Sequence, residues 1–331
     1  MKTTCAARLN LICLLSILSL LFLPAFAEQA SAKPIELKAI GFLPEDNDSI
    51  YGLRLFRDKV NERAKGALTI KIVGGPEAIP AFDQSSALKG GVMDLGYIPD
   101  AYFMRFVPET FALSLTRYNG GQERERGVVD FLQGLYRKAN IHYLGRGGGT
   151  IGFYICTLKN IDAIEGFKGL RLPASPIAIP AFKSLGMVSV DIEDAEIWTA
   201  LDRGVIGGTI DPTTLVASFR WYERLKYIID HKFYNLHTSI NFNLKSWEKL
   251  PTDLQNLLTN AMIDVEKEVT PWFEKKETEA YKQIIDGGVK PVKFSPPVAE
   301  QFYKKVYGAY WGAAKNRMSP ESFAKLQQLL Q

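Results

Sequence analysis

Strand-like and helical segments alternate along the N-terminal part of the chain, and this alternation restricts the possible folds more than any other feature. Residues 34–42, 67–75 and 91–98 have strand patterns, and helical patterns at 49–64 and 82–89 lie between them. Strands separated by a helix-length segment pair in parallel, because parallel neighbours need a crossover connection. We therefore predict an α/β fold with a largely parallel sheet and helices on both faces.

A second series of alternating segments begins after residue 140. Its helical patterns cover 177–185 and 195–203. Its strand-like runs are 141–147, 150–157, 168–173, 187–192 and 204–210. Two such series predict two α/β domains rather than one. No stretch of linker composition separates them, which favours domains joined by several crossing segments.

The C-terminal part of the sequence contains one very long helical pattern. It begins at Pro251, contains Pro271, where we expect a kink, and ends at Gly287. Its apolar face is formed by Leu254, Leu257, Leu258, Ala261, Met262, Val265 and Val269. A helix of about 35 residues is about 50 Å long, which exceeds a single small domain. We expect it to span both domains, with 28–155 and about 240–285 in the first, and 156–239 and about 286–331 in the second.

The N-terminus has the pattern of a secretory signal peptide. Two basic residues precede an apolar run at 9–22, and the small-residue site Ala25-Phe26-Ala27 follows. We expect residues 1–27 to be removed and the mature chain, beginning at Glu28, to reside in the periplasm. Cys156 is then the only cysteine, so no internal disulfide can form.

Charge and composition argue against a nucleic-acid partner. The formal net charge is +4, and two of these charges lie in the signal peptide, which leaves about +2 (4 minus 2). Basic and acidic residues are interspersed, whereas nucleic-acid binding favours a concentrated basic surface. No apolar segment of membrane-spanning length follows residue 27.

No motif indicates an enzyme, a metal site or a cofactor. The three histidines, His142, His231 and His237, lack ligand-type residues at helical spacing, so structural roles are favoured. The run GRGGGT at 145–150 lacks the P-loop lysine, and we interpret it as a tight connection between two strands. The run ERER at 123–126 is expected to open a helix and to form a solvated face.

Arg171 lies within GFKGLRLPASPIAIPAF (166–182), among small and apolar residues that suit a buried strand. An unpaired buried charge is costly, so either a protein carboxylate or a molecule from outside must meet this side chain. Ligands of open α/β sheets bind beyond the carboxyl ends of the strands. Aromatic side chains near predicted strand ends are therefore candidate ligand contacts, namely Tyr97, Phe153, Trp198 and Trp221.

Several segments, in this order, resemble the solute-binding proteins of tripartite ATP-independent periplasmic (TRAP) transporters, of the DctP family. They are KGALTIKIVGG, ALKGGVMDLGYI, GFKGLRLPASPIAIPAFKSLGM, ALDRGVIGGTIDP and SWEKLPTDLQNLL. The resemblance implies a two-domain periplasmic binding protein fold with a long domain-spanning helix. It also implies a monomer that delivers an organic acid to membrane permease subunits. In the family, the arginine of the GFKGLR-type stretch binds the ligand carboxylate, which here is Arg171.

Two departures from the family pattern affect the expected ligand. Many members carry a second arginine where this chain has TIGFY, and Arg146 is the nearest substitute. Asp211 stands where members often have an asparagine facing the ligand, so a second ligand carboxylate would be repelled. We therefore expect a monocarboxylate, hydroxy acid or amino acid held by Arg171 and Asp211. A dicarboxylate receptor, an exported sensor without transport, and a turn-capping role for Asp211 remain alternatives.

Overall fold

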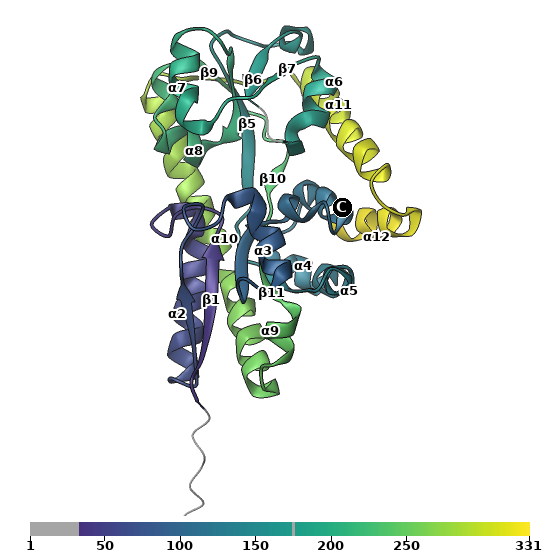
Figure 1. The fold of residues 1–331 in the computed structure, drawn as a ribbon. Helices are drawn as coiled ribbons and strands as arrows, with labels where there is room; N and C mark the ends of the chain where they lie inside the picture. The colour runs from purple at the N-terminus through teal and green to yellow at the C-terminus, as the bar shows by residue number, and fades with distance from the viewer. Residues whose placement is uncertain (1–32, 174–175) are drawn as a thin grey trace, which may run out of the picture. The chain divides into compact units, whose positions relative to one another are not determined.

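The computed structural model describes residues 33–173 and 176–331. The predicted signal peptide lies outside the described residues. The chain divides into two compact units, Met1–Pro34 and Ile35–Gln331. Everything that follows concerns the second unit, shown with its elements labelled in Figure 1.

The first sheet contains the predicted parallel strands. Its order is β2-β1-β3-β11-β4, and β1 pairs in parallel with both β2 and β3. Strand β11 then adds antiparallel to β3 and β4. The strands are β1 (Ile35–Gly41), β2 (Leu68–Ile72), β3 (Leu95–Pro99), β4 (Ile141–Arg146) and β11 (Thr238–Asn243). The predicted βαβαβ arrangement of the N-terminal part is confirmed.

Helices cover this sheet, and together they form what we call the first lobe. They are α2 (Tyr51–Ala64), α3 (Gln84–Gly90), α4 (Gly120–Glu125), α5 (Val128–Lys138) and α9 (Leu244–Glu248). Short 3-10 helices complete the lobe, namely η1 (Asp48–Ile50), η2 (Ala81–Asp83), η3 (Asp100–Phe103) and η4 (Pro108–Leu115). In α2, Leu53, Phe56 and Val60 recur at helical spacing and are buried, which explains why this segment packs as an amphipathic helix.

The second sheet forms the core of the second lobe. It has the order β10-β5-β9-β12, with β8 antiparallel to β5 and β12 parallel to β9. Its strands are β5 (Ile151–Thr157), β8 (Gly208–Pro212), β9 (Tyr227–Ile229), β10 (Asn235–Leu236) and β12 (Lys290–Val292). A parallel pair, β6 (Arg171–Pro173) and β7 (Val188–Val190), lies beside it, since the Gly207 amide donates to the Arg171 carbonyl oxygen at 2.8 Å.

The helices of the second lobe follow the predicted segments closely. They are α6 (Ile179–Leu185), α7 (Asp194–Asp202) and α8 (Thr213–Ser218), with the 3-10 helices η5 (Ile164–Phe167), η6 (Pro176–Ala178) and η7 (Trp221–Glu223). Two apolar clusters hold the lobe together. One contains Phe182 and Ile210, and the other contains Cys156, Leu201 and Trp221.

The run at 145–150 connects strands of different sheets, because β4 belongs to the first sheet and β5 to the second. The amides of Gly147 and Gly148 both donate to the carbonyl oxygen of Thr238 at 3.0 Å. A Cβ atom on Gly149 would lie 2.4 Å from Cβ of Phe273, so only glycine permits this approach to the long helix. The second crossing passes through His237, between β10 and β11.

The long helix α10 (Thr252–Asp286) has 35 residues and contacts both lobes. Residues from Leu254 to Phe273 pack in the cluster of the first sheet, whereas Ala280 and Ile284 pack in the second lobe. Figure 1 shows α10 running beside α2 and reaching α8. The predicted domain-spanning helix is confirmed.

The C-terminal helices are α11 (Pro296–Lys315) and α12 (Pro320–Leu330). Helix α11 packs on α6 of the second lobe and on η4 of the first, whereas α12 packs on η4 and α5 of the first lobe. The guanidinium group of Arg126 donates to the carbonyl oxygens of Gln328 and Leu329 at 3.0 and 2.9 Å. The chain end thus returns to the first lobe, although residues 286–331 were expected in the second domain. None of the helices in the described part of the chain is long and apolar enough to cross a membrane.

Candidate functional site

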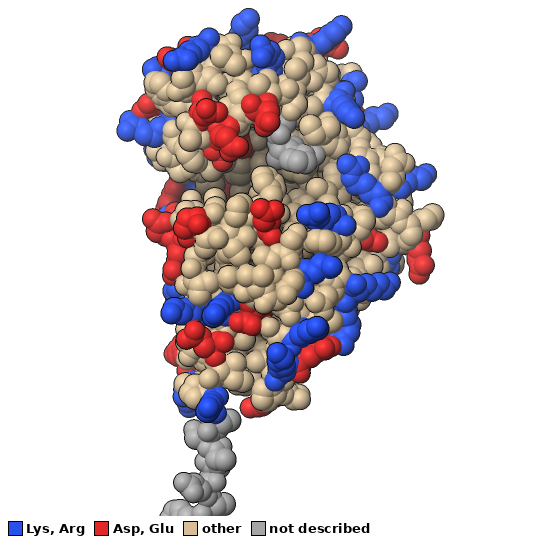
Figure 2. Space-filling model, in the orientation of Figure 1, with Lys and Arg blue, Asp and Glu red and all other residues tan. Residues whose placement is uncertain are grey.

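The candidate site is a cleft where segments that follow the strands of the two sheets meet. A cavity of about 370 Å³, open to solvent, lies between η1, which follows β1, and α8, which follows β8. Helix α10 forms its third wall. The lining residues are Asn47, Asp48, Ser49, Thr214, Leu215, Ala217, Ser218, Lys276, Glu279, Ala280 and Gln283. Figure 2 shows a hollow at this level of the molecule, with acidic side chains on both sides of it.

Asp211 is positioned at the carboxyl end of β8, opposite Tyr154 of β5. Its neighbour Ile210 packs in the cluster shared with α6, so Asp211 points from the other face of the sheet. Burial, together with the negative charge of Asp194, raises the pKa of Asp211 well above its ordinary value. No basic side chain among the described residues forms an ion pair with Asp211. A carboxylate in this position can accept hydrogen bonds from a ligand donor.

Asp194 of the second lobe and Tyr102 of the first lobe are close enough to interact electrostatically. Asp194 begins α7 just beyond the carboxyl end of β7, and Tyr102 lies in η3 just beyond β3. Burial and the charge of Asp194 raise the pKa of Tyr102 to about 12. The Tyr102 ring packs on Phe82 with centroids 4.6 Å apart, and Phe82 is 64% exposed. This aromatic pair provides apolar surface beside the acidic groups.

Lys276 supplies a positive charge to the wall formed by α10. Its Nζ lies 3.1 Å from the Oδ2 atom of Asp48, which is on η1 in the first lobe. The Thr213 hydroxyl donates to the carbonyl oxygen of Glu277 at 3.4 Å, which ties the segment after β8 to the same turn of α10. Lys276 therefore gives the α10 wall of the cavity a positive charge, whereas Asp211 lies just before the segment of α8 that lines it.

Arg171 is not among the residues that line this cavity. Arg171 is exposed, and it pairs with Val188 at the amino end of the parallel strands β6 and β7. Asp194 follows the carboxyl end of β7, at the other end of the pair. Gly207 is the residue whose amide donates to Arg171, and Asp211 follows Gly207 by four residues. Four residues span about 13 Å in an extended strand. The predicted burial of Arg171 is wrong, because its side chain leaves the face opposite the buried Leu172.

Arg146 is engaged inside the protein. It is 1% exposed, and its Nη1 lies 3.0 Å from Oε1 of Glu123. The same guanidinium group donates to the carbonyl oxygens of Tyr118 and Gly149 at 2.8 and 3.0 Å. In this structure the Arg146 guanidinium group is therefore paired with groups of the protein itself.

The predicted aromatic contacts are also distributed differently from expectation. Tyr97 is buried in the first sheet, and its hydroxyl donates to the Gly147 carbonyl oxygen at 3.2 Å. Trp221 is buried against Phe219, and Trp198 is covered by the guanidinium group of Arg224, 4.2 Å from its ring. Phe153 stacks on Tyr234 and lines a separate small pocket near the crossing segments. The structure thus leaves these four side chains outside the lining of the larger cavity.

The ERER run was interpreted wrongly. It ends α4 rather than opening a helix, and Glu123 is buried between Arg146 and His237. The histidines pack inside the structure, with His142 on Trp247 and His231 on Phe294. Within residues 33–173 and 176–331, no group of three or more His, Cys, Asp or Glu side chains is arranged to hold a metal ion.

Sequence reasoning missed Phe82, Asp194 and Lys276. The sequence could have indicated Asp194, because this residue comes just after a predicted strand and Asp211 likewise lies at a strand end. No sequence pattern indicates Lys276, because its place in the cavity wall depends on how helix α10 crosses between the lobes.

Comparison with known proteins agrees with this architecture. The model of the family described as bacterial extracellular solute-binding protein, family 7 (DctP), matches residues 41–316. A monocarboxylate 2-oxoacid-binding periplasmic protein of Nostoc sp. is 22% identical over 79% of this chain and 74% of its own length. A TRAP periplasmic solute-binding protein of Ochrobactrum anthropi superposes with a TM-score of 0.80 at 18% identity, covering 90% of this chain and 95% of that one. One from Desulfovibrio salexigens, with bound orotic acid, gives 0.78 at 18% identity, covering 89% and 97%.

Proposed function

Because the chain belongs to the family 7 (DctP) bacterial extracellular solute-binding proteins, we propose that it captures a small organic acid in the cleft between its lobes. The observation that carries this proposal is the solvent-open cavity of about 370 Å³, which is lined by both lobes and the spanning helix. Its size suits a small molecule, and its largely polar lining suits a ligand that carries charged or hydrogen-bonding groups. The ligands named for the Nostoc and Desulfovibrio proteins, a 2-oxoacid and orotic acid, carry carboxyl groups and support the ligand class.

We further propose that the protein acts as a periplasmic monomer and delivers its ligand to TRAP membrane permease subunits. The TRAP designation of the similar structures supports the transport role. Closure of two lobes that are joined by crossing segments would enclose the ligand, because contacts with both lobes favour the closed state.

The finer proposal concerns the two ends of the ligand. An amino acid or hydroxy acid fits best, with its ammonium or hydroxyl group donating to Asp211 and its carboxylate facing Lys276. The hydrogen bond from Thr213 to the Glu277 carbonyl oxygen supports this arrangement, because Thr213 lies two residues after Asp211 and Glu277 directly follows Lys276. A dicarboxylate is disfavoured, because Asp211 and Asp194 would repel the second carboxylate. Phe82 and Tyr102 would pack on the body of the ligand.

A thermal-shift screen of the purified protein against monocarboxylates, hydroxy acids, amino acids and dicarboxylates tests the proposal. Binding to the folded state raises the Tm by mass action. Small-angle scattering with the best compound should then show a smaller radius of gyration. A screen without any shift would contradict receptor function. A larger shift with dicarboxylates than with amino acids would contradict the ligand class.

A further inference from the structure

A cluster of four charged side chains is buried in the first lobe, away from the cleft just described. It consists of Asp100, Glu123, Arg146 and His237, each no more than 4% exposed. Their separation in sequence is large, since His237 lies 137 residues from Asp100 and 114 from Glu123. Buried charges are costly unless they are paired, so the pairing within this cluster decides its properties.

Both ring nitrogens of His237 contact a carboxylate. Nδ1 lies 2.7 Å from Oδ2 of Asp100, and Nε2 lies 3.1 Å from Oε2 of Glu123. A carboxylate offers only acceptors, and a neutral imidazole has only one N–H donor. When both carboxyl groups are ionised, which the lowered pKa of Glu123 favours for that residue, both contacts can be hydrogen bonds only if the ring carries two protons. The geometry therefore calls for an imidazolium.

The surrounding groups balance the charge of this imidazolium. Arg146 pairs with Glu123 at 3.0 Å, while Tyr136 and Ser239 donate to Oδ1 of Asp100 at 2.5 and 2.8 Å. Two carboxylates thus face two cations. The neighbouring charged pair, Arg124 and Glu266, is neutral as a unit, and the buried tyrosines Tyr136 and Tyr143 have raised pKa values and stay uncharged.

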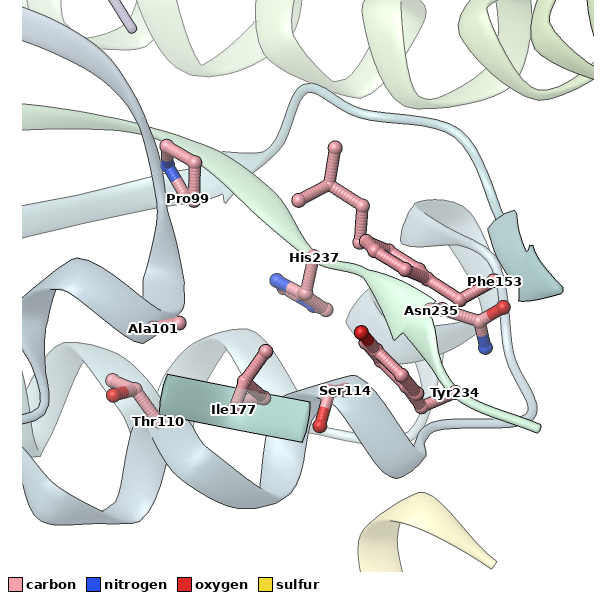
Figure 3. Close-up of a pocket in the computed structure, with 10 residues that line it drawn as sticks. Pro99, Ala101, Thr110, Ser114, Phe153, Ile177, Tyr234, Asn235 and His237 are labelled. Carbon is pink, nitrogen blue, oxygen red and sulfur yellow. The ribbon is translucent and has the colours of Figure 1, made fainter. Parts of the chain in front are cut away.

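The cluster holds both crossing segments to the first lobe. His237 is the residue between β10 of the second sheet and β11 of the first. Arg146 binds the Gly149 carbonyl oxygen in the connection from β4 to β5. Figure 3 shows His237 beside a small pocket, with Phe153 and Ile177 of the second lobe close by. The lining of this pocket is mainly apolar, so it offers no charge that could replace the proton.

We propose that His237 is a positioning residue whose bound proton fixes the pivot between the lobes, so that loss of this proton at alkaline pH loosens the pivot and weakens solute binding. The effect on binding rests on the proposed receptor function. Without the proton, one of the two carboxylates loses its donor, and the cluster carries one uncompensated negative charge in a buried setting.

The sign of the effect follows from the charges that face the ring. Burial alone would lower the pKa of His237, and Arg146 acts in the same direction, but Glu123 and Asp100 raise it above its ordinary value. A raised pKa means that the stabilisation is fully present below about 6.5 and is lost as pH rises through the pKa of the folded state. The proposal therefore concerns the alkaline side of neutrality.

Nuclear magnetic resonance of the imidazole groups tests the proton directly, because the chain has only three histidines. Burial lowers the pKa of His142 to about 4 and also lowers that of His231. We expect one resonance to titrate above 6.5, and to disappear in His237→Gln. Titration of the His237 resonance at or below 6.5 would overturn the proposal, and this arm needs no ligand.

The second arm measures the Tm and the Kd of the best screened solute from pH 6 to pH 10. As pH rises through the pKa of His237, we expect the Tm of the wild type to fall and its affinity for the solute to decrease by about tenfold. A tenfold decrease corresponds to a difference of about one unit between the His237 pKa values of the free and the solute-bound protein. His237→Gln should give a flat profile, and His231→Gln should behave as the wild type. If His237→Gln does not fold, Glu123→Gln should move the loss to lower pH. A wild-type Tm or Kd that is constant through the measured pKa would overturn the proposal, whereas absence of any solute binding would contradict only the receptor function.

Discussion

Arg171 and Asp211 lie at opposite ends of the strands that carry them. The Arg171 carbonyl oxygen accepts from the Gly207 amide at 2.8 Å, and Asp211 is four residues further along β8. We expect Arg171→Ala to leave solute affinity within about twofold of wild type. An arginine that anchored the ligand carboxylate would instead cost about 2 to 5 kcal/mol. Calorimetry separates the two results, and a loss of about 30-fold or more would return Arg171 to the binding site.

Asp211→Asn should weaken the binding of an amino acid and spare its deaminated analogue. The substitution replaces a charge-assisted hydrogen bond worth about 1.5 to 3 kcal/mol, so a loss of about 10- to 150-fold is expected. Because the pKa of Asp211 is raised, the affinity of the wild type for an ammonium ligand should increase as pH rises through that pKa. Equal affinities of both compounds for both proteins, measured by calorimetry, would remove Asp211 from the site.

Lys276→Gln should lower the affinity for a carboxylate ligand by about tenfold, as expected for one partly exposed charge-assisted contact. Lys282→Gln is the matched control, since Lys282 lies on the same helix but pairs with Asp286 on the surface, and neither residue lines the cavity. Titration calorimetry on both variants decides the matter. Parallel losses in the two variants would indicate a general charge effect instead of a contact.

Arg146→Met should destabilise the fold by about 3 to 5 kcal/mol, because it leaves Glu123 and Asp100 facing a single cation. Arg137→Met, which removes the surface pair with Glu248, should cost less than about 1 kcal/mol. Urea unfolding at pH 7 measures both. Similar midpoints for the two variants would show that the buried pair adds no stability over an exposed one.

Gly149→Ala should destabilise the protein, since its new methyl group would collide with Phe273 of α10 at the crossing between the sheets. Gly134→Ala is the control, because that glycine lies within α5 with open space around it and alanine is the better helix former. Thermal unfolding should show a lower Tm for the first variant and an unchanged or higher Tm for the second. An unchanged Tm for Gly149→Ala would mean that α10 shifts to accommodate the methyl group without a loss of stability.

The sequence predicted the local architecture well where one segment determines its own structure. The alternation of strands and helices before residue 100 and the limits of the long helix both follow from patterns within a single stretch. The start of β3 was placed too early, because Gly91 adopts a left-handed conformation with φ of 80° and ends α3 there. Such a boundary depends on backbone geometry that residue type alone does not fix.

The candidate site was harder to predict, because it depends on contacts between distant segments. A period-two pattern indicates that Arg171 and Leu172 face opposite sides, but it does not say which end of the strand faces the ligand. Glu123 has the surroundings of a surface residue in sequence, and its burial is explained only by two partners that are distant in sequence, Arg146 and His237. Such contacts follow from the tertiary fold.

The position of β11 between β3 and β4 also has a kinetic consequence. The first sheet remains in two pieces until residues 238–243 have been synthesised and released, because only this strand joins β3 to β4. Pairing across so long a stretch must overcome a large loop-closure entropy, which slows folding. The first sheet is therefore incomplete until nearly three quarters of the chain has been synthesised, and no shorter N-terminal fragment can complete the first lobe.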